Sequence, residues 1–238
     1  MYMKQIVSTD VEPQHARLLA RYRVLRAFAR RQSDAFVNYL SKDAIVKGAR
    51  RLGLCDSGRT ICFENESETD VLLDYCIYDH RDLAAGKQSR TAVERFALQA
   101  RPRPGTDELV MLEAALAARY TVLLVKKAVP GVGVEVTDAL RGQPFLLVDV
   151  GLSTTAVPGL GLATRVMMAD GIHMTTGAAL PILDRQVLDD VRAELFAALG
   201  DEPSAGVDSL TPRERARLSA AVIRACLANN ASSTVQYR

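Results

Sequence analysis

The sequence predicts an α+β protein in which helical regions lie before and after a small β-barrel. Residues 1–118 carry apolar side chains at helical spacing, and the same spacing returns over residues 184–238. Between them, residues 119–183 hold five short runs rich in β-branched residues, separated by turn dipeptides. Five strands joined by tight turns are typical of an antiparallel barrel. We therefore expect a five-stranded SH3-like barrel between an N-terminal helical region and C-terminal helices.

Two helices and a hairpin are expected at the start of the chain. One arc of the first helix collects Leu18, Leu19, Tyr22, Leu25 and Ala29. The stretch KDAIVKGARRLG (residues 42–53) predicts a second helix that ends at Gly53, because glycine tolerates the left-handed conformation found after helix ends. The stretch LGLCDSGRTICF (residues 52–63) then predicts a small hairpin around an Asp-Ser-Gly turn.

Three more helices carry start signals before the barrel. Ser67 precedes Asp70 by three residues, Thr91 precedes Glu94 by three, and Thr106 stands directly before a Leu-rich run. Hydroxyl side chains at these places can accept a hydrogen bond from the first turn of a helix. Each pattern therefore predicts a helix that begins just after the hydroxyl residue.

The five predicted strands are YTVLLVKKAV (120–129), VGVEVTDAL (132–140), PFLLVDV (144–150), LATRVMM (162–168) and IHMTT (172–176). Turn signals such as Pro130-Gly131 and Asp170-Gly171 separate them. The irregular stretch GLSTTAVPGLG (151–161) is the longest predicted loop of the barrel.

Two helices are expected after the barrel, over residues 184–199 and 212–228, with a polar linker between them. The second opens with LTPRER (210–215), which resembles the start of the helix-turn-helix domain of LuxR-type transcription factors. Such a domain needs several further helices, whereas 23 residues follow Arg215. A helix start explains the motif better, with Thr211 as the cap, Pro212 in the first position and Glu214 completing a capping box.

Composition favours a cytoplasmic protein. No apolar run reaches the ~18 residues of a membrane helix, and the first residues lack the apolar segment of a signal peptide. Four cysteines in 238 residues do not suggest a disulfide framework. The net charge of +2 is uneven, because residues 1–55 hold 11 Lys or Arg against 4 Asp or Glu. We expect no membrane partner and no cofactor.

Arginines of the first helix form a candidate nucleic-acid site. They are Arg17, Arg21, Arg23, Arg26, Arg30 and Arg31. Clustered arginines can neutralise phosphates. On a helical wheel, however, they fall on both sides of the apolar arc, which is typical of side chains that cover the edges of a buried stripe. This solvent-exposed role is the alternative to nucleic-acid or acidic-protein binding.

Two further sites are weaker hypotheses. Cys55 and Cys62 face each other across the predicted hairpin, and Cys76 and His80 are four residues apart, a ligand set that zinc accepts. Their spacing differs from a tight zinc knuckle, so buried free thiols are the alternative. Asp79 beside His80 could orient an imidazole for acid–base catalysis, but they read equally well as a polar helix end.

Several segments together resemble a group of uncharacterised bacterial proteins, some of which carry a SEC-C zinc tail. The segments are LLDYCIYD (72–79), DLAAGKQS (82–89), RTAVERF (90–96), TDALRGQPFLLVDV (137–150) and GLGLATRVM (159–167). The resemblance covers about residues 68–183 and implies helices followed by a small barrel. The tail is missing here, because NNASSTVQYR (229–238) has no cysteine. The resemblance implies architecture and no activity.

The sequence therefore favours a non-catalytic bacterial binding or scaffold protein that acts through protein–protein contacts or self-association. Val157 and Leu160, in the long barrel loop, are the expected contact residues, since loops of small barrels commonly meet partners. Nucleic-acid binding through the N-terminal arginines is the first alternative. An enzyme that uses Asp79 and His80 is the second.

Overall fold

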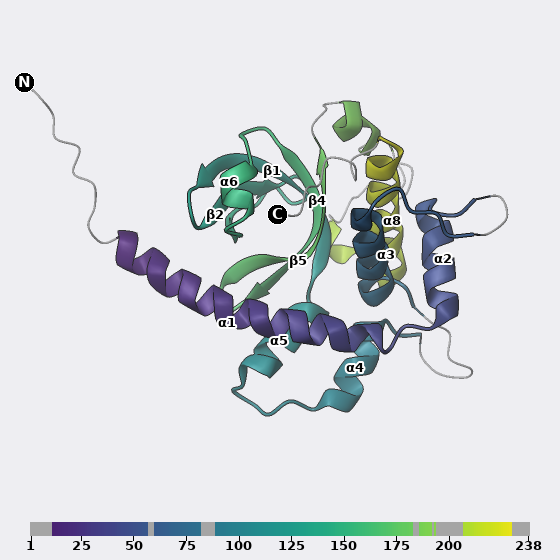
Figure 1. Ribbon diagram of the computed structural model, residues 1–238, viewed down its shortest axis with the longest axis horizontal. Coiled ribbons are helices and arrows are strands. Elements are labelled where there is room, and N and C mark those ends of the chain that lie inside the picture. The colour runs from purple at the N-terminus through teal and green to yellow at the C-terminus, as the bar shows by residue number, and fades with distance from the viewer. Residues whose placement is uncertain are drawn as a thin grey trace, which may run out of the picture.

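The computed structural model describes residues 11–56, 60–81, 89–182, 186–191, 193 and 207–229. In this part of the chain the helices before the barrel are α1 (Val11–Val37), α2 (Lys42–Leu52), α3 (Glu66–Tyr78), α4 (Ala92–Ala100) and α5 (Asp107–Leu116). The barrel strands lie beside α3 and α8, while α1 runs along the base of the molecule next to α5 (Figure 1). The prediction of an α+β protein is confirmed.

Helix ends follow local side-chain chemistry. The Ser41 hydroxyl accepts a hydrogen bond of 3.0 Å from the Ala44 amide at the start of α2, and Gly53 ends this helix with φ of 81°. Thr91 and Glu94 form the predicted capping box of α4. The predicted start of α3 at Ser67 is wrong by two residues, because the extended residue at the helix entrance is Asn65. Ser67 instead lies buried in the first turn.

The C-terminal helix α8 (Pro212–Ala228) begins and ends where the sequence predicts. The Thr211 hydroxyl accepts from the Glu214 amide at 3.3 Å, and the Glu214 carboxylate accepts from the Thr211 amide at 2.7 Å. This reciprocal pair satisfies two amides that a helix start leaves without partners. Before it lies a short 3-10 helix, η1 (Val207–Ser209).

Five strands form the sheet: β1 (Arg119–Val129), β2 (Gly133–Asp138), β3 (Pro144–Val148), β4 (Gly161–Ala169) and β5 (Ile172–Ile182). They close in the order β1-β2-β3-β5-β4. The prediction of an antiparallel sheet is wrong for one pair, because β3 and β5 run parallel where Leu147 meets His173. Since the chain crosses from β3 to β4 through helix α6 (Leu152–Thr155), β4 can pair with β1, and β5 returns beside β3.

The middle of the barrel is filled by small and medium aliphatic side chains. They include Leu123, Val125, Val134, Val136, Leu147 and Leu162. β1 pairs with both β2 and β4, and its register shifts between Val125 and Lys127. Such a bulge increases local bending, which lets one strand take part in both sides of a closed sheet.

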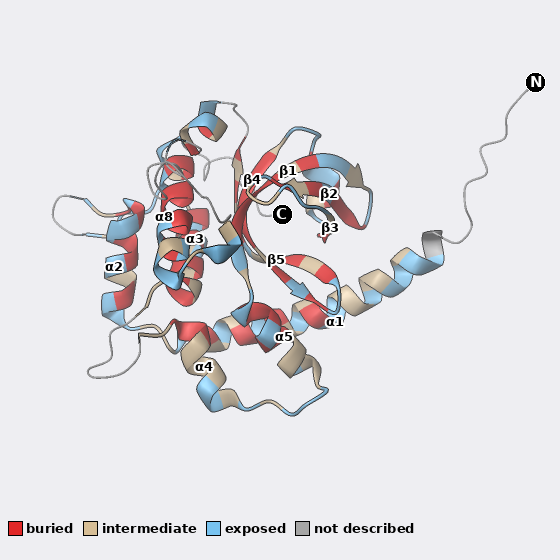
Figure 2. Cartoon of the chain, turned by 180° about the vertical axis from the view of Figure 1, so that it is seen from behind, coloured by how far each residue is buried: buried red, intermediate tan, exposed pale blue. Residues whose placement is uncertain are grey.

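One hydrophobic core joins the helices to the barrel. Its buried members include Leu72 and Tyr75 of α3, Leu180 of β5, and Val222 and Ile223 of α8. Figure 2 shows the same arrangement, with buried residues concentrated on α3, α8 and the strands. The regions 1–118, 119–183 and 184–238 that the sequence suggests therefore share a core over the described residues.

Some predictions fall outside the described residues. The turn of the predicted hairpin includes residues 57–59, although Cys55 and Ile61 beside it form an isolated antiparallel bridge. Of the helix predicted over 184–199, residues 186–191 and 193 are described and are helical. Among all described helices, none is long and apolar enough to cross a membrane.

Close packing at Gly133 provides a test of the barrel. A Cβ atom there would lie 2.0 Å from the Leu147 carbonyl oxygen of the paired strand, so β2 and β3 would have to separate. We expect Gly133→Ala to lower the free energy of unfolding by about 2–3 kcal/mol in urea denaturation.

Gly151→Ala is the matched control. Its Cβ would lie 3.5 Å from the nearest atom, an Asp149 side-chain oxygen, and its φ of −64° suits alanine. We expect a change within ~1 kcal/mol or a small gain. Equal losses in both variants would contradict the tight β2–β3 approach.

Candidate functional site

Two adjoining cavities lie around the end of α3, one between α2 and α8 and the other between α8 and the barrel. We call the larger one, of about 670 Å³, the arginine cleft. It is lined by Lys47, Arg50, Arg51, Asp79, His80, Arg81, Ser89, Arg213, Ala216 and Arg217. We call the smaller one, of about 320 Å³, the seam cavity, and its lining includes Tyr78, Leu116, Tyr120, Arg165, Arg215 and Leu218. Asp79 and Arg81 line both cavities, which places them at the boundary.

Two helix ends supply the arginines of the cleft. Arg50 and Arg51 occupy the last turn of α2, just before Gly53. Arg213 and Arg217 are four residues apart in the first two turns of α8 and therefore lie on one side of that helix. The helices approach closely enough for the Arg224 guanidinium to donate to the Arg51 carbonyl at 3.4 Å. Packing of α2 against α8 thus brings residues from distant parts of the chain together.

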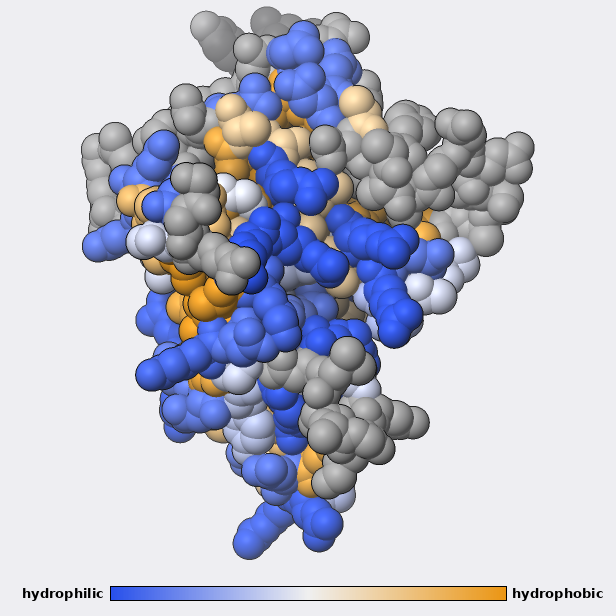
Figure 3. Space-filling model, turned by 90° about the vertical axis from the view of Figure 1, so that its right-hand side faces the viewer, coloured by the Kyte–Doolittle hydropathy of each residue, from blue (hydrophilic) through white to orange (hydrophobic). Residues whose placement is uncertain are grey.

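The cleft has an excess of positive charge. Arg50, Arg51, Arg213 and Arg217 are all exposed, and among the described residues none of them forms an ion pair. Arg51 donates to the Tyr75 hydroxyl at 3.4 Å. Figure 3 views the side of the molecule that carries α2 and α8, and strongly hydrophilic side chains gather across its middle. Such a concentration of unneutralised guanidinium groups attracts anions.

The carboxylate that lines the cleft, Asp79, is already occupied. Arg165 of β4 is 2% exposed, and its Nε donates to Asp74 at 2.9 Å while its Nη2 donates to Asp79. The Thr176 hydroxyl donates to the second oxygen of Asp74 at 2.7 Å. Burial raises the pKa of the Asp79 carboxyl, and the Arg165 charge opposes that rise. The ion pair with Arg165 therefore holds Asp79 in place at the boundary between the two cavities.

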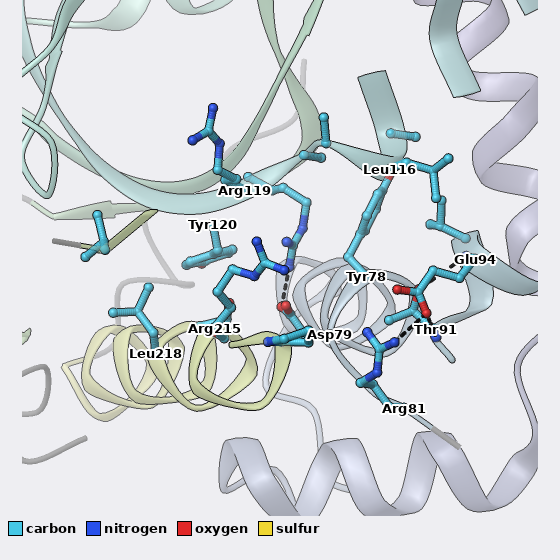
Figure 4. A pocket seen from close by; sticks show the side chains of 18 of the residues that line it. Tyr78, Asp79, Arg81, Thr91, Glu94, Leu116, Arg119, Tyr120, Arg215 and Leu218 are labelled. Atoms are coloured by element: carbon cyan, nitrogen blue, oxygen red, sulfur yellow. Dashed lines mark hydrogen bonds and ion pairs between the residues drawn. The ribbon is translucent and has the colours of Figure 1, made fainter. Parts of the chain in front are cut away.

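Aromatic rings enclose the same guanidinium. The centre of the Arg165 guanidinium lies 4.7 Å from the Tyr78 ring centroid and 5.5 Å from that of Tyr120. Figure 4 shows Tyr78 between Asp79 and Leu116, with Arg215 on the opposite side of Asp79. Burial raises the pKa of the Tyr78 and Tyr120 hydroxyls. The seam cavity therefore combines aromatic, apolar and charge-paired walls.

Asp79 and His80 both line the arginine cleft, as the enzyme hypothesis requires. The Asp79 carboxylate is held by Arg165, however, and its position is determined by that buried ion pair. α3 ends at Tyr78, so His80 lies beyond the helix and is half-buried. Acid–base catalysis by this pair stays a prediction.

The six N-terminal arginines divide into two groups. Arg21, Arg26 and Arg31 make contacts within the protein. Their partners are Asp107 and Asp170 for Arg21, the Thr175 carbonyl for Arg26, and the Ala27 carbonyl and Phe28 ring for Arg31. Arg17, Arg23 and Arg30 are exposed. Part of the basic front end therefore meets the protein's own acidic residues and carbonyls, and four of the six arginines, Arg31 among them, are exposed.

The four predicted zinc ligands do not come together. Cys76 is buried beneath α2, with its Sγ 3.6 Å from the Ala44 carbonyl oxygen, whereas Cys62 is exposed and Cys55 is half-buried. Cys55 pairs with Ile61 rather than with Cys62. Across the described part of the chain, no group of three or more His, Cys, Asp or Glu side chains could hold a metal.

The two predicted contact residues of the barrel loop differ in exposure. Val157 is 58% exposed. Leu160 is half-buried and packs against the barrel interior, and its carbonyl accepts from the Val125 amide at 2.9 Å. A polar substitution at Leu160 would therefore disturb the barrel itself, so Val157 is the better probe of this surface.

Sequence reasoning missed the arginine cleft. The sequence explains LTPRER as a helix start and assigns its arginines no role, but Arg213 lines the cleft and Arg215 lines the seam cavity. The spacing of Arg213 and Arg217 was a signal for one cationic helix face. Nothing local to either helix indicates that this face lies opposite the end of α2.

The Arg165 network is open to a stability test. Arg165→Met leaves two buried carboxylates without a cation, so we expect the free energy of unfolding to fall by about 3–5 kcal/mol in guanidinium titration. Lys47→Met removes the exposed pair with Asp43 on α2 and should cost less than ~1 kcal/mol. Similar effects of the two substitutions would refute the central role of Arg165.

Comparison with known proteins gives one match. Residues 16–183 match a family of unknown function, DUF7986, and this range runs from α1 to just beyond β5. It contains Arg50, Arg51 and the Arg165 network and stops before α8. No curated protein and no solved structure matches the chain. Because the match covers more than half of its length, the chain belongs to the family of unknown function DUF7986.

Proposed function

We propose that this protein is a non-catalytic binding module and that its ligand is a multiply charged anion, such as a phosphate ester, held in the arginine cleft. One observation carries the proposal: exposed arginines of α2 and α8 converge on a concave surface without carboxylate partners among the described residues. In the seam cavity, most arginines are matched by carboxylates, as Arg165 is by Asp74 and Asp79.

The chemistry of guanidinium groups supports phosphate as the bound group. Arginine presents planar, paired donors that match phosphate oxygens, and charge-assisted hydrogen bonds of this kind are stronger than neutral ones. A cleft of about 670 Å³ also lies in the range usual for small-ligand sites. The two arginine pairs approach from different helices, so one phosphate-bearing group can meet donors from both sides.

The barrel supports the site structurally, and its own surface is a weaker candidate for anion binding. Its strand order, with β5 between β3 and β4 and a helix between β3 and β4, favours an OB-type barrel over the SH3-like type expected from the sequence. The β1–β2 and β4–β5 connections are short turns, and residues 120–183 hold four basic and four acidic side chains. Charge therefore favours the helix-lined cleft over the barrel surface as the anion site.

Binding of inorganic tripolyphosphate tests the proposal. In calorimetric titration at low salt, we expect the wild-type protein to bind this ion. The double variant Arg213→Gln/Arg217→Gln should bind it at least about tenfold more weakly, because each lost charged hydrogen bond is worth roughly 1.5–3 kcal/mol. The affinity of the wild type should fall as salt is raised.

The control variant is Arg23→Gln/Arg30→Gln, which removes the same charge from exposed positions of α1. Its affinity should stay within about twofold of the wild type, since these side chains lie on another helix. Absence of binding by the wild type, or an equal loss in the control, would rule the proposal out. The second result would instead favour the N-terminal arginines as an anion site.

Self-association through the end of the barrel is a second candidate function. Val150 and Val157 lie on either side of α6 and are 40% and 58% exposed. Exposed apolar side chains mark a contact site where they form a continuous patch, and these two valines are the candidates for such a patch.

We expect Val157→Asp to keep the fold and to abolish any rise of mass with concentration in sedimentation analysis. Val24→Asp, at a 43% exposed position of α1, should leave that rise unchanged. A wild-type protein that stays monomeric at every concentration would exclude this contact.

A further inference from the structure

We propose that the anion is a nucleotide, with its phosphates in the arginine cleft and its base in the seam cavity. This inference rests on the proposed function and names the ligand class of the same site. Asp79 and Arg81 line both cavities, so one extended molecule can occupy the two together. The cavities differ in charge, and that difference determines which end of the ligand each one suits.

The seam cavity is close to electrically neutral although several arginines line it. Their carboxylate partners are Glu94 for Arg81, Asp208 for Arg119, Asp138 and Asp208 for Arg141, and Asp74 and Asp79 for Arg165. The pairs made by Arg119 and Arg141 with Asp208 measure 2.7 and 2.8 Å. Of the lining arginines, Arg215 has no carboxylate partner among the described residues. An uncharged group therefore suits this cavity better than a second phosphate.

The walls of the seam cavity suit a planar ring. Half-buried Tyr78 offers aromatic surface, and Leu116, which is 47% exposed at the end of α5, offers aliphatic surface. The exposed Arg215 guanidinium is a planar cation of the kind that stacks on nucleobases. Figure 4 places the Glu94 carboxylate beside Arg81 on this side of the cavity, and the described hydrogen bonds of this carboxylate all use its Oε2 atom, which leaves Oε1 as a polar atom of the lining. A base combines a flat apolar face with a polar edge, which matches this lining.

Size favours a small ligand over a polymer. Both cavities, of about 320 and 670 Å³, fall within the range of small-molecule sites. A simple sugar phosphate would fill the arginine cleft, but it has no planar ring that could pack against the aromatic and aliphatic walls of the seam cavity. A nucleoside di- or triphosphate has several charges at one end and an uncharged ring at the other, so it fits both compartments.

The experiment compares nucleotides with the bare anion. Calorimetric titrations in the presence of a chelator would measure ATP, GTP, CTP, UTP and inorganic tripolyphosphate against the wild-type protein. We expect at least one nucleotide to bind about tenfold more tightly than tripolyphosphate, because the base adds stacking contacts that the bare anion lacks. Leu116→Glu should remove this advantage and leave tripolyphosphate binding within about twofold. Ala117→Trp places a large side chain in the seam cavity from an exposed position. It should likewise remove the advantage of the nucleotide and leave tripolyphosphate binding within about twofold.

The control Val24→Glu, on α1, should leave both affinities unchanged, and thermal melting should show that each variant is folded. If tripolyphosphate binds and no nucleotide binds more tightly, the nucleotide inference fails while the anion site stands. If the nucleotide advantage survives both Leu116→Glu and Ala117→Trp, the seam cavity is not the base site and the inference fails. If neither tripolyphosphate nor any nucleotide binds, the proposed function fails as well.

Discussion

The buried ion pairs of Arg165 with Asp74 and Asp79 hold this structure together at its centre. Arg165 belongs to β4, whereas the two carboxylates lie on and just after α3, so the pairs fix the helical region against the barrel. A charge in this position is tolerated only because both carboxylates and two aromatic rings surround it. The end of α3, and with it the shared boundary of the two cavities, takes its place from this contact.

The same network determines how charge is distributed around the site. Because Arg165 satisfies Asp79, no free carboxylate of that residue remains to neutralise the arginines of α2 and α8. On the barrel side, Asp138 and Asp208 balance Arg141. One side of Asp79 is therefore strongly positive and the other nearly neutral, although both contain several arginines. The sequence alone would not show this difference in charge, because the ion pairs of the arginines depend on how the strands and helices pack together.

Local chemistry made much of the fold predictable. The caps at Thr91, Thr106 and Thr211 act within a few residues, and they correctly mark the starts of α4, α5 and α8. The five strands are also visible in the sequence, but the parallel contact of β3 with β5 depends on how the chain crosses the barrel. The candidate site could not be predicted for the same reason, because Arg50 and Arg217 line one cleft only through the packing of α2 against α8. Asp79 and His80 were recognised, whereas the buried partner of Asp79 was not.

The capping box at Thr211 has a consequence beyond the stability of α8. The first turn of a helix tends to fray, because its amides lack partners in the preceding turn. Arg213 sits in that turn, while Arg217 lies a full turn deeper and is held by the regular helix. By holding the first turn in helical form, the Thr211 hydroxyl and the Glu214 carboxylate keep the Arg213 backbone in place in the lining of the cleft. A small polar contact on the surface thus preorganises one of the donors that would meet an incoming anion.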